Sequence, residues 1–193
     1  MSRIVAGTLG GRRIRTPAGT TTRPTSDRVR EALFARAESL LGGPGGLDGL
    51  AVLDLYAGSG AVGLEALSRG AASAVLVESD RQAVAVLHAN IALLGVGSRA
   101  RVLPRRVERV LADTAPAPAD LVFADPPYET GATALRHALA TGERAGWLAA
   151  GAVVVVERSC RDDWEFPAGI ALDGERRYGD TSLWYGHVDP SMT

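Results

Sequence analysis

Two short polar segments each follow an apolar run, and both contain residue types suited to chemistry. The first is Asp54-Leu55-Tyr56-Ala57-Gly58-Ser59-Gly60, and the second is Asp125-Pro126-Pro127-Tyr128. A glycine-rich turn after a strand is typical of a site that holds a nucleoside-bearing cofactor. An acid beside two prolines offers fixed acceptors for a planar amine. Together the two segments predict the transfer of a methyl group to nitrogen.

The glycine turn alone fits two cofactor classes. Residues 58–63 match the G-x-G-x-x-G pattern, and Glu78 lies 20 residues after Gly58, where an acid that binds ribose hydroxyls is expected. A dinucleotide would place its pyrophosphate close to the Asp54 carboxylate, whereas S-adenosylmethionine has no phosphate and carries positive charges that a carboxylate stabilises. Asp54 therefore favours the methyl donor. The alternative without a ligand is a tight turn, with Glu78 as an acid at a helix N-terminus.

The second segment suits the activation of a base amine. The lone pair of such an amine is delocalised into the ring, so acceptors that hold both N–H groups favour a pyramidal, nucleophilic nitrogen. We expect the Asp125 carboxylate and the Pro126 carbonyl to be these acceptors, with Pro126 and Pro127 fixing the backbone. Tyr128 offers a face on which an extruded base can stack. The alternative is an ordinary Asp-Pro turn.

The elements that must position these segments alternate along the chain. Apolar runs predict strands at 51–56, 74–78, 100–103, 120–124 and 152–157, and helical spacing predicts helices at 61–69, 80–94, 107–112 and 131–141. Strands separated by helices indicate a mostly parallel sheet with helices on both faces. Residues 170–178 and 182–187 predict a terminal antiparallel hairpin. Both polar segments then lie beyond the carboxyl ends of strands, where ligands bind in such sheets.

A basic segment precedes this pattern. Residues 1–36 hold eight arginines against two acids, a net charge of +6, although the whole chain has a net charge of -1. Residues 3–16 predict a β-hairpin, and a helix capped by Thr25 or Ser26 follows and ends at the glycine-rich residues 42–46. We therefore expect an appendage at residues 1–46 and a main domain at residues 47–193.

The arginines of the basic segment suit phosphate, because the planar guanidinium donates two parallel hydrogen bonds. The alternative is a solvated basic face. The residues that we expect to bind a nucleic acid are Arg3, Arg12, Arg13, Arg15 and Arg23.

Length and composition limit the number of domains, the location of the protein and the use of disulfides or metals. With 193 residues, 46% of them hydrophobic and 22% charged, the chain suits one globular core. Its apolar runs are shorter than the roughly 20 residues of a membrane span, and its first residues lack a signal-peptide pattern, so we expect a cytoplasmic protein. Cys160 is the single cysteine and the three histidines are scattered, which predicts neither a disulfide nor a metal site.

Four segments of the chain, in order, resemble one family. Residues 3–7, 22–34, 54–60 and 125–128 are similar to the bacterial guanine-N2 methyltransferases of small-subunit ribosomal RNA, the RsmD family of class I S-adenosylmethionine-dependent methyltransferases. The resemblance covers nearly the whole chain. The Asp-Pro-Pro-aromatic signature is shared with DNA adenine, RNA and protein-glutamine methyltransferases, so specificity rests mainly on the N-terminal segments.

The resemblance implies an α/β, Rossmann-like fold with a mixed, mostly parallel seven-stranded sheet, helices on both faces, and an N-terminal β-hairpin and helix. It implies S-adenosylmethionine as the cofactor and the N2 amine of an extruded guanine in 16S ribosomal RNA as the acceptor, held by residues 125–128. The resemblance implies that Asp54, Gly58 and Gly60 hold the methionine end of the cofactor, Glu78 its ribose, and residues near Arg106 and Val107 its adenine. The further cofactor contacts that it implies are Tyr56, Ala57, Ser59 and Ser79. This fold usually has an Asp or Asn to accept from the adenine amine, and Arg106 cannot accept.

The expected partner is small-subunit ribosomal RNA, free or in an assembling 30S particle, bound by a monomer that uses neither a metal nor a membrane. One alternative is a DNA adenine-N6 or protein-glutamine methyltransferase, but the chain has no room for a separate DNA-recognition domain, and a protein substrate leaves the +6 segment unexplained. Another is a non-catalytic RNA-binding assembly factor. The presence of Asp54, Glu78 and Asp125 argues against an assembly factor without activity, because burying acids that have no function costs free energy of desolvation.

Overall fold

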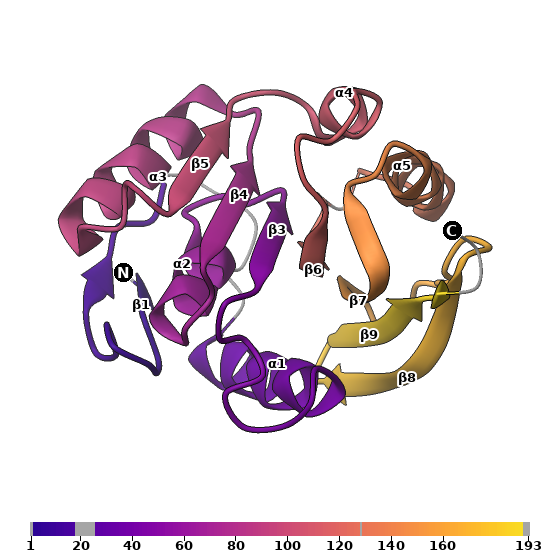
Figure 1. Ribbon diagram of the computed structural model, residues 1–193, viewed down its shortest axis with the longest axis horizontal. Coiled ribbons are helices and arrows are strands. Elements are labelled where there is room, and N and C mark those ends of the chain that lie inside the picture. The colour runs from indigo at the N-terminus through magenta and orange to yellow at the C-terminus, as the bar shows by residue number, and fades with distance from the viewer. Residues whose placement is uncertain (1, 18–25, 128, 191–193) are drawn as a thin grey trace.

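A seven-stranded sheet lies at the centre of the computed structural model, which describes residues 2–17, 26–127 and 129–190 (Figure 1). Its strand order is β5-β4-β3-β6-β7-β9-β8. The strands are β3 (Ala51–Leu55), β4 (Ser73–Val77), β5 (Ala100–Leu103), β6 (Ala119–Ala124), β7 (Leu148–Ser159), β8 (Ile170–Tyr178) and β9 (Thr181–Val188). β3 to β7 pair in parallel, whereas β9 pairs antiparallel with both β7 and β8. The expected mixed, mostly parallel sheet is confirmed.

Helices cover both faces of the sheet because its strands alternate their side chains between two cores. In β6, Leu121 and Phe123 belong to one hydrophobic cluster and Val122 to the other, as the two-residue period of a strand requires. The helices are α1 (Asp27–Leu40), α2 (Ala61–Ser68), α3 (Arg81–Leu94), α4 (Val107–Leu111) and α5 (Ala132–Arg144). Residues of α1, α2 and α3 join the first cluster, and residues of α4 and α5 join the second.

Most element ends lie within two residues of the sequence prediction, and the start of β7 and the end of α5 differ by more. β7 begins at Leu148, four residues before the expected start at 152, because Leu148 pairs with Ala119 beyond a register shift. α5 continues to Arg144 rather than ending at residue 141. Gly151 interrupts the apolar residues before position 152, and residues 142–144 are Gly-Glu-Arg, so both extensions depend on pairing and packing. Among the described residues, no helix is both long and apolar enough to cross a bilayer.

The basic N-terminal segment packs directly on the main domain. Its hairpin consists of β1 (Ser2–Arg3) and β2 (Arg13–Ile14), paired antiparallel. Ile4 and Ile14 are buried in the same cluster as the apolar side chains of α2. The fully buried Glu65 of α2 accepts hydrogen bonds from the backbone N–H groups of Val5 at 2.6 Å and Ala6 at 2.9 Å. The hairpin and helix α1 are confirmed, and the boundary at residue 46 stays a prediction.

The order in which strands are added to the sheet reverses between the parallel neighbours β3 and β6. From β3 the chain proceeds outward to β4 and β5, and β6 then starts on the other side of β3 and leads to β7. Such a switch point opens a crevice at the carboxyl ends of the strands. Leu55 pairs with Ala124, so the residues that follow β3 and β6 lie side by side at this crevice.

Candidate active site

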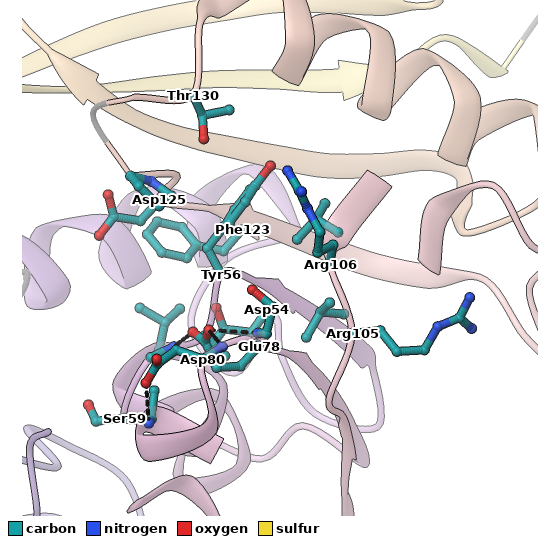
Figure 2. Close-up of a pocket in the computed structure, with 18 of the residues that line it drawn as sticks. Asp54, Tyr56, Ser59, Glu78, Asp80, Arg105, Arg106, Phe123, Asp125 and Thr130 are labelled. Carbon is teal, nitrogen blue, oxygen red and sulfur yellow. Dashed lines mark hydrogen bonds between the residues drawn. The ribbon is translucent and has the colours of Figure 1, made fainter. Parts of the chain in front are cut away.

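A cavity of about 860 Å³ lies at the carboxyl ends of β3, β4 and β6 (Figure 2). It brings together most of the described residues that the sequence predicts for the site. Those that line it are Asp54, Tyr56, Ala57, Gly58, Ser59, Glu78, Ser79, Arg106, Val107, Asp125 and Pro127. Gly60 and Pro126 do not line it, and Tyr128 lies outside the described residues. The two polar segments therefore share one site, as expected.

Asp54 is a buried acid within β3 whose carboxylate faces the cavity. Its Oδ2 accepts a hydrogen bond of 2.8 Å from the backbone N–H of Gly63, in the first turn of α2. The pKa of Asp54 is raised to about 7, mainly by burial and also by the nearby Glu78, while the bond from Gly63 opposes the shift. A positive ligand charge would favour the ionised form. A Cβ at position 63 would lie 3.1 Å from Asp54 Oδ2, so glycine permits this close approach.

The loop after Asp54 is held in an uncommon backbone conformation. Tyr56 has φ 62°, a left-handed value that a non-glycine residue rarely adopts, and Gly60 has φ 82° at the N-cap of α2. A Cβ at Gly60 would collide with the side chain of Leu87. Strained backbone of this kind persists where surrounding structure holds it, commonly at ligand sites. The hydroxyl of Tyr56 is buried and bonds to none of the described residues.

Glu78 joins the loops that follow β3 and β4. Its Oε2 accepts from the backbone N–H of Gly58 at 2.8 Å, and its Oε1 accepts from the N–H groups of Ser79 and Asp80 at 2.7 and 2.8 Å. Asp80 in turn caps α3 by accepting from Ala83 N–H at 2.8 Å. Oε2 accepts only from Gly58 among these donors and keeps a second lone pair, which suits a hydroxyl donor. Glu78 thus shapes the glycine turn and also lines the cavity.

The third wall of the cavity begins α4. Arg106 is the N-cap residue, and its side chain is 77% exposed, with one ion-pair contact of 3.5 Å to Glu108. Its guanidinium lies near the Tyr56 side chain, whereas the Arg105 side chain points away (Figure 2). The Val107 N–H belongs to the first helical turn, where backbone donors have no partner within the helix. This backbone donor suits a ring nitrogen better than the Arg106 side chain does.

Asp125 follows β6 directly and is partly buried. Burial raises the pKa of its carboxyl group well above the ordinary value, and the nearby Glu157 and Asp54 raise it further, whereas Arg158 lowers it. Beyond the two prolines, the Thr130 N–H donates to the Pro127 carbonyl at 2.8 Å. The acid is therefore held at the cavity by a short, constrained loop. Residues 125–127 and 129–131 are called the clamp loop below.

Sequence reasoning missed Glu157 and Arg158, at the carboxyl-terminal part of β7. Glu157 is buried, and the Arg158 side chain is 7% exposed. Both follow the apolar run 152–156, just as Asp125 follows β6, and this parallel was the available signal. Thr16 and Pro17 also line the cavity, so the basic segment reaches the site. No local pattern marks that contact.

The predicted RNA-binding arginines have different environments. Arg3 pairs with Asp27 at 2.8 Å, and Arg12 donates to the Leu93 carbonyl at 2.6 Å, near the end of α3. Arg13 and Arg15 are exposed on the hairpin and just after it, and Arg23 lies outside the described residues.

Comparisons with known proteins agree with this geometry. The chain matches the family described as Conserved hypothetical protein 95 over residues 2–187. It is 38% identical over 181 residues to "Ribosomal RNA small subunit methyltransferase D" of Escherichia coli strain K12, across 93% of this chain and 86% of that protein. The protein of the same name from Haemophilus influenzae is 32% identical, across 80% of this chain and 77% of its own. Among solved structures, the yhhF protein of Escherichia coli aligns with a TM-score of 0.84 at 34% identity over 98% of both chains.

Proposed function

Because the chain belongs to the Conserved hypothetical protein 95 family, the RsmD family of class I S-adenosylmethionine-dependent methyltransferases, we propose that it methylates the N2 amine of a guanine in 16S ribosomal RNA. The observation that carries this proposal is the meeting of Asp54 and Asp125 in one cavity at the switch point of the sheet. The names of the Escherichia coli and Haemophilus influenzae relatives support the choice of ribosomal RNA. That substrate would place the enzyme in the cytoplasm.

The residues around the glycine turn fit S-adenosylmethionine. Asp54 is a buried acid that lines a cavity of about 860 Å³, and the ammonium of a methionine moiety would compensate its charge. Glu78 would accept from the ribose hydroxyls, and the Val107 N–H would donate to the adenine ring. When bound, the cofactor supplies a methyl group activated by a positively charged sulfur. The acid at position 54 disfavours a pyrophosphate at the same place.

The clamp loop would prepare the amine for attack. The Asp125 carboxylate and the Pro126 carbonyl would accept one N–H each, which holds the nitrogen lone pair toward the methyl group. Methylation leaves the nitrogen with one proton too many. The raised pKa of Asp125 suits it to take up that proton, because a general base works best when its pKa lies close to the pH of the reaction. Tyr128, outside the described residues, is proposed to stack on the base.

The exposed arginines of the N-terminal segment would hold the RNA backbone. Arg13 and Arg15 are exposed, and the adjacent Thr16 and Pro17 line the cavity, so phosphates bound here would lie close to the extruded base. Contacts to phosphate position a substrate without reading its sequence and weaken as salt rises. Arg3, Arg12 and Arg23 are proposed to assist. We propose a monomer that acts without a metal ion on free RNA or on an assembling 30S particle.

The test is transfer of labelled methyl from S-adenosylmethionine to small-subunit ribosomal RNA, free and in partly assembled particles, followed by nucleoside analysis. N2-methylguanosine in either substrate supports the proposal and identifies the substrate form. Label in another nucleoside would overturn the choice of guanine N2. The absence of transfer despite cofactor binding would overturn the RNA substrate and direct the same assay to DNA adenine and protein glutamine.

A further inference from the structure

We propose that Arg158 of β7 is a positioning residue that holds the clamp loop in its reactive geometry by binding the Thr130 carbonyl. This inference rests on the proposed function, because it assigns Arg158 a part in the same methyl transfer. Arg158 does not line the cavity, whereas Thr130 does. It therefore acts through the loop rather than by touching the substrate.

The contacts of Arg158 bridge the clamp loop and the end of β7. Its Nη1 donates to the Thr130 carbonyl at 2.7 Å, and its Nη2 pairs with the Asp162 carboxylate at 2.8 Å. Arg158 lies on a central strand and its side chain is 7% exposed. The sheet therefore fixes its backbone, and the surrounding residues restrict the conformations of its side chain. Thr130 is held twice, since its own N–H donates to the Pro127 carbonyl at 2.8 Å. The loop is thereby fastened three residues after the second proline.

The charge of Arg158 matters as well as its hydrogen bonds. Asp125 faces Asp54 of β3 and Glu157 of β7, and both acids disfavour its ionised form. Arg158 is the cation that opposes them at Asp125. Within a partly dry site such interactions are stronger than in water. Loss of Arg158 would leave three carboxyl groups together without this compensation and would make Asp125 harder to ionise.

The test compares Arg158→Gln and Arg158→Lys with the matched control Arg177→Gln, which removes an exposed arginine paired with Glu175 on β8. Methyl transfer to ribosomal RNA is measured from pH 5 to 9, together with S-adenosylmethionine affinity and thermal unfolding. We expect Arg158→Gln to lower kcat at least tenfold and to move the acid limb of the profile to higher pH, with cofactor affinity within twofold of the parent. Arg158→Lys should keep the acid limb in place and recover part of kcat, because it restores the charge but not the two-pronged bridge. Arg177→Gln should resemble the parent protein.

Amide hydrogen exchange gives a readout that needs no activity. Exchange at residues 129–131 should become faster in Arg158→Gln and stay unchanged in Arg177→Gln, if Arg158 fastens the loop. Parental kcat, pH profile and exchange in Arg158→Gln would overturn the proposal, and so would a variant that only melts earlier while its folded molecules keep parental kcat. If the parent protein transfers no methyl to ribosomal RNA, the proposed function fails. In that case the positioning proposal is still tested by hydrogen exchange, and unchanged exchange at residues 129–131 in Arg158→Gln would overturn it.

Discussion

The two acids of the cavity have different environments, although both have a raised pKa. Asp54 is fully buried and bonds to the Gly63 N–H, whereas Asp125 is partly buried among Asp54, Glu157 and Arg158. Burial is the largest cause at both positions. Asp54 therefore suits a fixed positive charge that stays bound, and Asp125 suits neutral N–H groups and a proton. This difference at the residue scale separates the proposed cofactor and acceptor roles.

The affinity for S-adenosylmethionine should rise with pH up to about 7 and then level off. The pKa of Asp54 is raised from 3.8 to about 7, so below pH 7 the empty site holds a proton that a cationic ligand must displace. The same shift means that the ligand-free fold loses stability as pH rises from about 4 to about 7, since the folded state binds the proton more tightly than the unfolded chain does. Calorimetric titration between pH 5 and 8.5 measures the affinity. Asp54→Asn should bind weakly without this slope, and an equally steep slope in that variant would contradict the assignment.

Asp125→Asn should lower kcat by a factor of about a hundred or more while cofactor affinity changes little. The asparagine keeps an acceptor oxygen but loses the negative charge, and electrostatic acceptors or donors at a reacting group are commonly worth roughly 10²–10³ in rate. Single-turnover methyl transfer and calorimetric binding of S-adenosylmethionine separate the two effects. If Asp125→Asn transferred methyl at the parental rate, the clamp would not depend on this carboxylate.

At the scale of elements, α3 connects the basic segment to the cofactor loop. The buried Asn90 of α3 accepts from the Arg15 N–H at 2.8 Å and donates to the Arg15 carbonyl at 3.0 Å and the Ser59 carbonyl at 2.9 Å. Arg12 donates to the Leu93 and Leu94 carbonyls, in the last turn of the same helix. A cation at this end also interacts favourably with the helix dipole. Within one short segment, Arg12 therefore holds the fold together, whereas the side chains of Arg13 and Arg15 are exposed to solvent.

Arg12→Ala and the double variant Arg13→Ala/Arg15→Ala should therefore have different effects. Arg12→Ala should lower the free energy of unfolding by about 1 kcal/mol, because it removes bonds to helix-terminal carbonyls. The double variant should keep the parental Tm and raise the KM for RNA. Its RNA affinity should also fall less steeply with salt, by the equivalent of about two lost phosphate contacts. Denaturant unfolding and transfer kinetics at several salt concentrations measure these effects. Equal loss of cofactor affinity in the double variant would refute the division of labour between basic segment and cofactor loop.

At the scale of the whole molecule, one core crosses the boundary expected at residue 46. Ile4, Ile14, Leu33 and Phe34 are buried in the same cluster as the residues of α2, α3 and β3. Glu65 adds two hydrogen bonds between α2 and the hairpin. Appendage and main domain are distinct in sequence pattern, but their apolar faces are mutually buried.

Residues 47–193 alone should fail to unfold cooperatively. Removal of residues 1–46 would expose the apolar side of α2 to water and would remove the two backbone donors of Glu65, and each such loss costs on the order of 1–3 kcal/mol. Circular dichroism during thermal unfolding, with the full chain as reference, tests this expectation. A sharp transition at the parental Tm would show that the appendage is a separate unit.

The sequence by itself determined the local elements and the place of the two motifs. Apolar runs bounded by turns predict β3 and β6, and the geometry of a parallel sheet then brings Asp54 and Asp125 to one edge, because the carboxyl ends of parallel strands meet there. Only the tertiary structure decided which distant side chains complete the site. Arg158 reaches a carbonyl 28 residues away, and Glu65 reaches an N–H 60 residues away. Such bonds join single side chains to backbone groups in a finished fold, so they leave no periodic pattern along the chain.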